Sequence, residues 1–114
     1  MIIRRRLQNL PKNVKTIAQL KGAWIIGGTA EWLTSRGAEL PKDYDFIVAP
    51  ETLQEVLRIL SVYSYSIIIN SFGGIKATKG GTVIDVWPCR LDEFVVDGTG
   101  KIAVGALNGL VVRW

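Results

Sequence analysis

Short apolar runs separated by glycine pairs are the feature that most constrains the fold of this chain. Two such pairs, Gly73-Gly74 and Gly80-Gly81, divide the region between residues 65 and 87 into three runs of strand length. Glycine pairs favour tight turns, because glycine adopts backbone conformations that other residues avoid. The sequence therefore predicts strands at 65–70, 74–78 and 82–87.

The first half of the chain alternates between helical and strand patterns. Its helical segments space apolar residues three or four apart, whereas its strands are short continuous apolar runs. In chain order, the predicted elements are a helix at 12–21, a strand at 23–26, a helix capped by Thr29 and ending at Gly37, a strand at 43–49 and a helix from Pro50 to about 60. Further short strands are expected at 94–96, 101–104 and 110–112. This order predicts an α+β fold, a small mixed β-sheet with helices on one face.

Length and composition limit the organisation of the protein. Its 114 residues suit one domain, 1–114, of which 48% are hydrophobic and 21% charged, as in ordinary globular proteins. The single cysteine, Cys89, excludes an internal disulfide, and no secretory signal or membrane span is recognised. We therefore expect a cytoplasmic protein. Because the chain has no histidine, histidine catalysis and histidine zinc sites are excluded.

Positive charge is concentrated at the start of the chain. Residues 1–21 hold six of the fourteen lysines and arginines and no acid, so the remaining eight face ten acids. The body is mildly acidic, and residues 1–11 form a basic N-terminal arm. Such an arm suits contact with nucleic acid or a polyphosphate, and it is equally consistent with a solvated terminus.

The first candidate site is the tripeptide Gly27-Gly28-Thr29, between a predicted strand and a predicted helix. Glycines let the backbone approach a ligand, and the following helix offers unpaired N–H groups and the positive end of its dipole. The tripeptide is therefore a candidate triphosphate-binding turn. An ordinary turn without a ligand is the competing interpretation.

Two aspartates, Asp43 and Asp45, begin the second predicted strand. Alternate residues of a strand point to the same side, so these carboxylates are expected to share one face. Each raises the pKa of the other, and a cation between them relieves the repulsion. Hard divalent ions such as Mg²⁺ bind oxygen ligands of this type. A solvated strand start is the competing interpretation.

A third aspartate, Asp85, interrupts the apolar run at 82–87. A lone carboxylate is costly when it is buried and unpaired. It lies either at an exposed edge or beside the same cation as Asp43 and Asp45. The acid pair and the glycine turn favour the second alternative, so the three aspartates are expected to converge from two strands.

The other aromatic and basic residues have plainer interpretations. The four tryptophans are mainly core residues, with Trp32 or Trp87 as alternatives for stacking on a base. The strand at 65–70 is apolar on both faces, so it is either central in the sheet or an exposed edge that pairs with another copy. Three scattered lysines are interpreted as solvated: Lys76, Lys79 and Lys101.

The order and spacing of these motifs resemble the DNA-polymerase-β-like nucleotidyltransferase superfamily. The resemblance rests on Gly-Gly-Thr at 27–29, Asp-Tyr-Asp at 43–45 and a third aspartate on a later strand. The runs at 72–76 and 84–88 are similar to the head domains of CCA-adding and poly(A)-polymerase-like enzymes. The resemblance covers residues 23–90. It implies transfer of a nucleoside monophosphate from an NTP to a hydroxyl acceptor, with release of pyrophosphate.

The resemblance also implies roles for particular residues. Asp43 and Asp45 would bind two metal ions, Mg²⁺ or Mn²⁺, and Asp85 would bind one of them and orient or deprotonate the attacking hydroxyl. Gly27, Gly28 and Thr29 would hold the triphosphate. Two further cations, Lys42 and Arg90, are assigned to nucleotide binding, with plain surface charges as the alternative. The acceptor implied is an RNA end, a protein or a small molecule.

The sequence departs from the CCA-adding pattern at two places. That pattern has Arg-Asp where this chain has Glu31 and Trp32, and it has a long helical region with no counterpart before Trp114. A minimal transferase is therefore expected, as a homo-oligomer or with a partner chain that supplies substrate binding. The competing hypotheses are a non-catalytic nucleotide- or partner-binding module on the same fold and a small nucleic-acid-binding domain.

Overall fold

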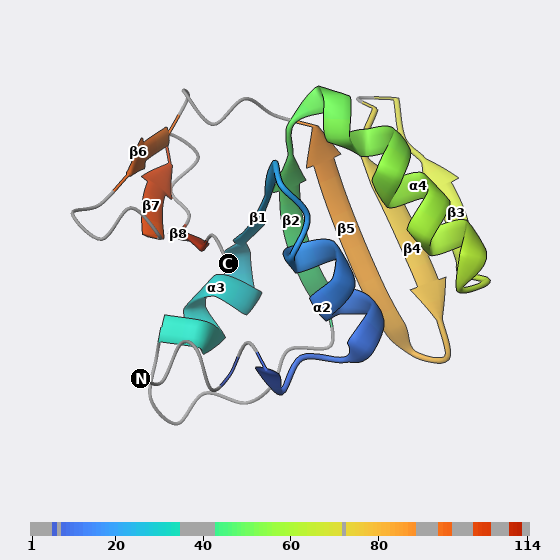
Figure 1. The fold of residues 1–114 in the computed structure, drawn as a ribbon, viewed down its shortest axis with the longest axis horizontal. Coiled ribbons are helices and arrows are strands. Elements are labelled where there is room, and N and C mark those ends of the chain that lie inside the picture. The colour runs from blue at the N-terminus through green and yellow to red at the C-terminus, as the bar shows by residue number, and fades with distance from the viewer. Residues whose placement is uncertain are drawn as a thin grey trace.

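The structure of the chain is a computed structural model that describes residues 6, 8–34, 43–71, 73–88, 94–96, 102–105 and 110–112. The helical elements are α2 (Lys12–Ala18), α3 (Gly27–Thr34), a 3₁₀ turn η1 (Pro50–Thr52) and α4 (Leu53–Val62). The strands are β1 (Ala23–Ile26), β2 (Asp43–Val48), β3 (Ser66–Ile69), β4 (Ile75–Lys79), β5 (Thr82–Pro88), β6 (Phe94–Val96), β7 (Ile102–Gly105) and β8 (Leu110–Val112). Figure 1 shows their arrangement.

The strands form a single mixed sheet in the order β3-β4-β5-β2-β1-β8-β7-β6. The neighbours β2 and β5 run parallel, and every other neighbouring pair is antiparallel. The connection from β2 to β5 contains α4 and the β3–β4 hairpin. The predicted fold class, a mixed sheet in an α+β fold, is confirmed.

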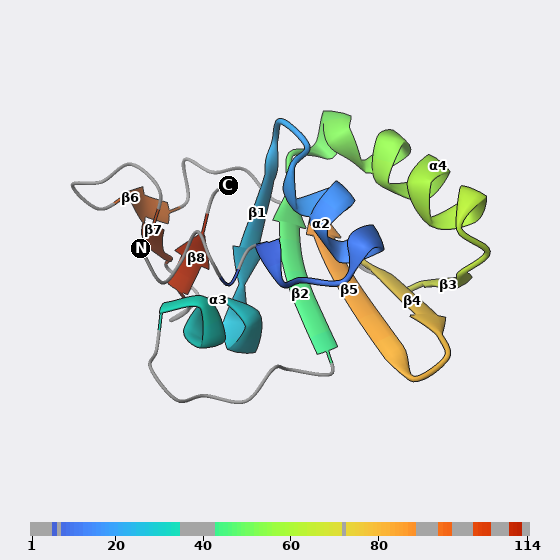
Figure 2. The same ribbon diagram turned by 60° about the horizontal axis from the view of Figure 1, so that its bottom comes forward.

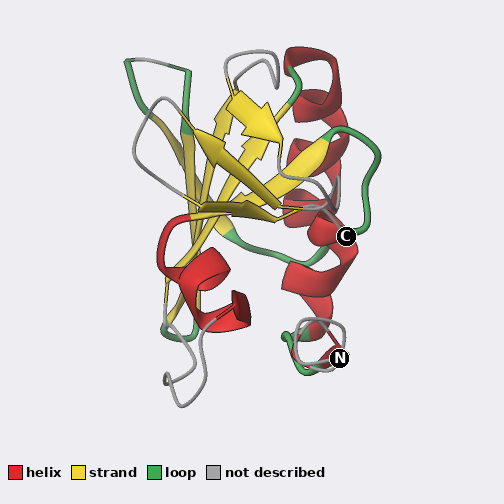
Figure 3. Cartoon of the chain, turned by 90° about the vertical axis from the view of Figure 1, so that its left-hand side faces the viewer, coloured by secondary structure: helices red, strands yellow, loops and turns green. Residues whose placement is uncertain are grey.

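Helices α2 and α4 cover one face of the sheet, and in Figure 3 they stand to its right. Helix α4 begins after Pro50, which suits the first turn of a helix, and buries Val56, Ile59 and Leu60 at the spacing of one helical face. These residues join one buried cluster with Phe46 of β2 and other inward-facing strand residues. We call this side of the sheet the helix-covered face.

Helix α3 follows β1 without a connecting loop and contacts β1, β2 and β8 (Figure 2). The reversal occurs at Gly27, whose φ of +62° lies in the left-handed region. The helix therefore begins at Gly27, before the predicted cap, and Thr29 lies inside its first turn and does not cap it. The predicted end at Gly37 lies outside the described residues.

The remaining predicted elements are found within two or three residues of their expected bounds. The apolar strand β3 occupies an edge of the sheet, so the central position is excluded. Its side chains Ile68 and Ile69 are largely exposed. None of the described helices has the length and apolarity that crossing a membrane requires.

Candidate functional site

Strands β2 and β5 divide their side chains between two faces. On the helix-covered face, Phe46, Ile84 and Val86 are fully buried. The alternate residues point to the opposite face, because successive side chains of a strand alternate. Asp45 and Asp85 belong to this second set, which we call the acidic face. The same two strands therefore provide both a core and a cluster of acids.

The strand register brings the three aspartates together. Asp45 pairs with Asp85 across the parallel β2–β5 ladder. Neighbouring strands lie about 4.8 Å apart, and directly paired residues point to the same side. Asp43 stands two residues before Asp45 on β2, about 7 Å along the same face. The three aspartates from two strands therefore share one face, with Asp45 and Asp85 directly paired.

The electrostatics show that this negative charge is poorly compensated. Burial is the largest cause of a rise in the pKa of Asp45 to about 6, and the nearby carboxylates of Asp85 and Asp43 contribute to the same rise. The pKa of Asp85 is also raised, mainly by burial, with Lys76 opposing and Asp43 adding to the rise. A positive charge bound at this face would relieve both carboxylates.

Lys76 of β4 is exposed, as the sequence predicts, and it also lies beside the acids. It pairs directly with Asp85 across the antiparallel β4–β5 ladder. The sequence signal for this pairing is the Gly80-Gly81 pair, which favours a two-residue hairpin turn. In the structure both glycines have positive φ, of +54° and +86°, as such a turn requires. Counting outward from that turn places Lys76 opposite Asp85.

Gly27 lies directly against the carboxylate of Asp45. Its neighbour Ile26 pairs with Asp45 across the β1–β2 ladder. A Cβ added to Gly27 would lie 2.8 Å from the Asp45 Oδ2 atom, so the carboxylate occupies the space that a side chain would need. Only glycine satisfies both this contact and the positive φ. The turn and the carboxylate therefore share one small volume.

Thr29 connects the first turn of α3 to the strand that carries two of the acids. Its side chain is fully buried. The hydroxyl donates to the carbonyl oxygen of Asp43 at 3.3 Å and accepts from the amide of Asp45 at 3.2 Å. These two bonds set the position of α3 relative to β2. The structure gives Thr29 a positioning role, and its direct contact with a triphosphate stays a prediction.

Gly28 is the open member of the tripeptide. A Cβ added there would meet no atom within 4 Å. Space for a ligand therefore exists directly above the first turn of α3. The other two predicted nucleotide-binding residues, Lys42 and Arg90, lie outside the described residues.

The basic arm and Trp32 are connected. The guanidinium of Arg6 donates to the carbonyl oxygen of Trp32 and lies 5.2 Å from the centre of its ring. The Trp32 side chain is only 8% exposed. At the position where the CCA-adding pattern has Asp, this chain therefore has an aromatic anchor for its basic arm.

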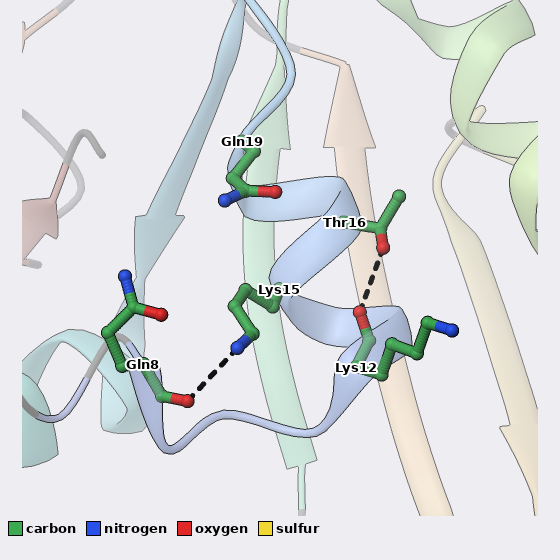
Figure 4. Close-up of a pocket in the computed structure, with 5 residues that line it drawn as sticks. All are labelled: Gln8, Lys12, Lys15, Thr16 and Gln19. Atoms are coloured by element: carbon green, nitrogen blue, oxygen red, sulfur yellow. Dashed lines mark hydrogen bonds between the residues drawn. The ribbon is translucent and has the colours of Figure 1, made fainter.

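A shallow depression on α2 is separate from the acids, because α2 lies on the helix-covered face. It is lined by Gln8, Lys12, Lys15, Thr16 and Gln19 (Figure 4). Within it, the Lys15 ammonium donates to the Gln8 carbonyl at 3.1 Å, and the Thr16 hydroxyl donates to the Lys12 carbonyl at 2.9 Å. The depression is basic, but it has no geometric connection to the glycine turn.

The donor chemistry of the acidic face fits a hard divalent cation. Carboxylate oxygens are the ligands that Mg²⁺ and Mn²⁺ prefer. Within the described part of the chain, no three acid, cysteine or histidine side chains are gathered into a formed ligand set. The fit therefore rests on the pairing of Asp45 with Asp85 and on their raised pKa values.

Comparisons with known proteins agree with this architecture. No family model matches the sequence, and no curated protein matches it. A CCA-adding enzyme in complex with CTP superposes with a TM-score of 0.59 over 99% of this chain at 17% identity. The Thermotoga maritima CCA-adding enzyme in complex with tRNA superposes with a TM-score of 0.60 over 100% of this chain, also at 17% identity.

A third solved structure is closer in size. It is a Thermotoga maritima protein provisionally assigned as a nucleotidyltransferase, with a TM-score of 0.57 and 16% identity over 99% of this chain and 80% of its own length. By contrast, this chain spans about one third, 33% and 32%, of the length of the two CCA-adding enzymes. The fold of this chain is therefore the polymerase-β-like nucleotidyltransferase fold.

Proposed function

We propose that this chain is a metal-dependent nucleotidyltransferase. It would move a nucleoside monophosphate from an NTP to a hydroxyl acceptor and release pyrophosphate. The observation that carries the proposal is the pairing of Asp45 with Asp85 on adjacent parallel strands, beside the glycine turn at Gly27. The fold shared with CCA-adding enzymes supports it.

The three aspartates of the acidic face would have different roles. Asp43 and Asp45 would hold two Mg²⁺ or Mn²⁺ ions, and Asp85 would share one of them. Such ions stabilise the charge that develops on the attacking and leaving oxygens of an in-line displacement. Asp85 would also orient the acceptor hydroxyl and accept its proton, which its raised pKa favours.

The glycine turn and Lys76 would hold the phosphates. Backbone N–H groups at the start of α3 are unpaired within the helix and suit a triphosphate. Gly28 leaves open space above them. Lys76 places a positive charge beside Asp85, where it would offset the charge of the reacting phosphate.

The substrates of the similar structures indicate those of this chain. They are complexes of CCA-adding enzymes with CTP, ATP and tRNA. An NTP donor and an RNA acceptor are therefore the first substrates to test, with a protein or a small molecule as the other acceptors. This chain spans about a third of the length of those enzymes, and we propose a partner chain or a second copy as a source of further substrate contacts.

The direct test is transfer of label from each of the four NTPs to a panel of RNA, protein and small-molecule acceptors, with Mg²⁺ or Mn²⁺. Asp45→Asn should reduce transfer at least about 100-fold, the loss typical of one key electrostatic group. Glu51→Gln is the matched control, because it removes one exposed acid on η1. Equal transfer by wild type and Asp45→Asn would refute the proposal.

A second test uses the glycine pair. Gly28→Ala adds a methyl group that meets no protein atom, and alanine favours a helix, so the fold should be retained. The same change should weaken binding of a non-hydrolysable NTP about tenfold or more, because the methyl group enters the space assigned to the phosphates. Unchanged NTP affinity would exclude this turn as the triphosphate site.

A non-catalytic nucleotide-binding module is the second candidate. It is favoured because the described acids are not gathered into a formed ligand set and because Trp32 stands where the CCA-adding pattern has Asp. This candidate predicts NTP binding that persists in EDTA and no transfer to any acceptor. Calorimetry with and without EDTA, beside the transfer assay, separates the two functions.

A further inference from the structure

The acidic face carries an apolar row next to its acids. Two residues beyond Asp45 and Asp85, in the same strand direction, lie the paired residues Ile47 and Trp87, with Trp24 paired to Ile47 on the other side. Side chains two positions apart share a face, so this row stands about 7 Å from the acid pair. Ile47 and Trp24 are buried, whereas Trp87 is 39% exposed.

The indole of Trp87 packs against Gly74. A Cβ added to Gly74 would lie 2.7 Å from Cε3 and 2.8 Å from Cζ3 of Trp87. The ring therefore lies directly against the glycine backbone. Gly74 itself is fixed, because its amide donates to the Asn70 Oδ1 atom at 2.9 Å and its carbonyl accepts from the Asn70 amide at 2.9 Å. One side of the ring is supported, and the side chain stays partly open.

The glycine turn and Trp87 lie on opposite sides of the acid pair. Strand β1 runs antiparallel to β2, so Gly27 follows Ile26 toward the Asp43 end of the face. Strand β5 runs parallel to β2, so Trp87 lies beyond Asp85 in the other direction. The glycine turn directly follows β1 and Trp87 lies on β5, and β2 lies between these two strands.

The geometry of in-line displacement indicates which substrate lies on each side of the acid pair. The attacking and leaving oxygens stand on opposite sides of the reacting phosphorus. If the triphosphate lies at the glycine turn, pyrophosphate leaves on that side and the acceptor hydroxyl approaches from the side of Trp87. A flat, partly exposed indole next to that hydroxyl suits an aromatic ring, and every nucleobase has a face that stacks on tryptophan.

We infer that Trp87 is the platform on which the terminal base of a nucleic-acid acceptor stacks. The inference rests on the proposed function, and it narrows the acceptor to a nucleic-acid 3′ end. Trp87 is then a substrate-binding residue, and Gly74 is the residue that positions its ring. Trp32 has no such role, because it is buried beneath Arg6.

The experiment compares two short RNA oligonucleotides in fluorescence anisotropy, without turnover. One ends in a normal 3′ nucleoside and the other lacks the terminal base. Wild type should bind the complete RNA about tenfold or more tightly, the range for loss of one base–aromatic stack. Trp87→Ala should abolish this difference, and Trp87→Phe should largely keep it. Val62→Ala, which shortens an exposed side chain on α4, is the control that should change nothing.

The outcomes separate this inference from the proposed function. Undiminished discrimination in Trp87→Ala, or no difference between the two RNAs in wild type, would overturn the inference. Weaker binding of a non-hydrolysable NTP by Trp87→Ala, with RNA binding unchanged, would also overturn it and assign the ring to the donor nucleotide. Nucleotide transfer by wild type is measured in a separate assay. The result of that assay tests the proposed function and does not test the role of Trp87.

Discussion

The two faces of the sheet differ in burial and in charge. On strands β2 and β5, Phe46, Ile84 and Val86 are fully buried beneath α2 and α4. One residue away along each strand, Asp45 and Asp85 stand side by side with raised pKa values. The helix-covered face stabilises the fold, and the acidic face costs stability while no cation balances its charge. Because successive side chains of a β-strand point to opposite faces, a strand of six or seven residues can carry both a buried core row and an acidic row.

The largest expected effect is on the helix-covered face. Phe46→Ala should lower the free energy of unfolding by about 3–5 kcal/mol, because it removes a fully buried ring and leaves a cavity. Thermal or urea unfolding measures this directly. A loss below about 1 kcal/mol would mean that this face does not carry the stability of the domain.

Thr29 connects α3 to β2, and its substitution should have an intermediate effect. Thr29→Val keeps the shape but leaves the Asp43 carbonyl and the Asp45 amide without their hydroxyl partner. We expect a loss of about 1–3 kcal/mol in unfolding free energy. Thr29→Ser, which retains the hydroxyl, should lose less, and equal losses would show that the hydrogen bonds contribute little.

The smallest expected effect is a gain in stability on substitution of Asp45 on the acidic face. The folded pKa of Asp45, about 6, lies above its ordinary value of 3.8, so the folded chain binds this proton more tightly than the unfolded chain. The resulting stability is fully present below pH 3.8 and is lost as the pH rises through about 6. Asp45→Asn has no such titration.

In metal-free buffer, Asp45→Asn should therefore be more stable than wild type by about 1 kcal/mol at pH 7.5, after allowance for solvent screening. The difference should shrink toward pH 4. Urea unfolding of both proteins at several pH values measures it. A variant that is less stable than wild type at pH 7.5 would show that the acid pair is not strained.

The local parts of this architecture were accessible from the sequence. Glycine pairs, short apolar runs and helical spacing gave the strands and helices to within a few residues, because these signals act over a few positions. The pairing of Lys76 with Asp85 also follows from the two-residue turn at Gly80-Gly81. The lysine is exposed, as expected, and the hairpin register adds its position opposite Asp85.

The non-local parts could not be obtained in this way. The alignment of Asp45 with Asp85 depends on a parallel pairing between strands that are 40 residues apart in the chain, which no local signal sets. The buried position of Thr29 and the close approach of Asp45 to Gly27 arise only once α3 packs against β2. The edge position of β3 likewise depends on the order of the whole sheet.

The most direct test of the central claim is the effect of Mn²⁺ on thermal unfolding. If the paired aspartates share a cation, Mn²⁺ should raise the unfolding temperature of wild type and of the control Glu51→Gln, because binding to the folded state alone stabilises it. Asp45→Asn and Asp85→Asn should show little or no rise. An equal rise in all four proteins would contradict the account, since the cation would then bind elsewhere.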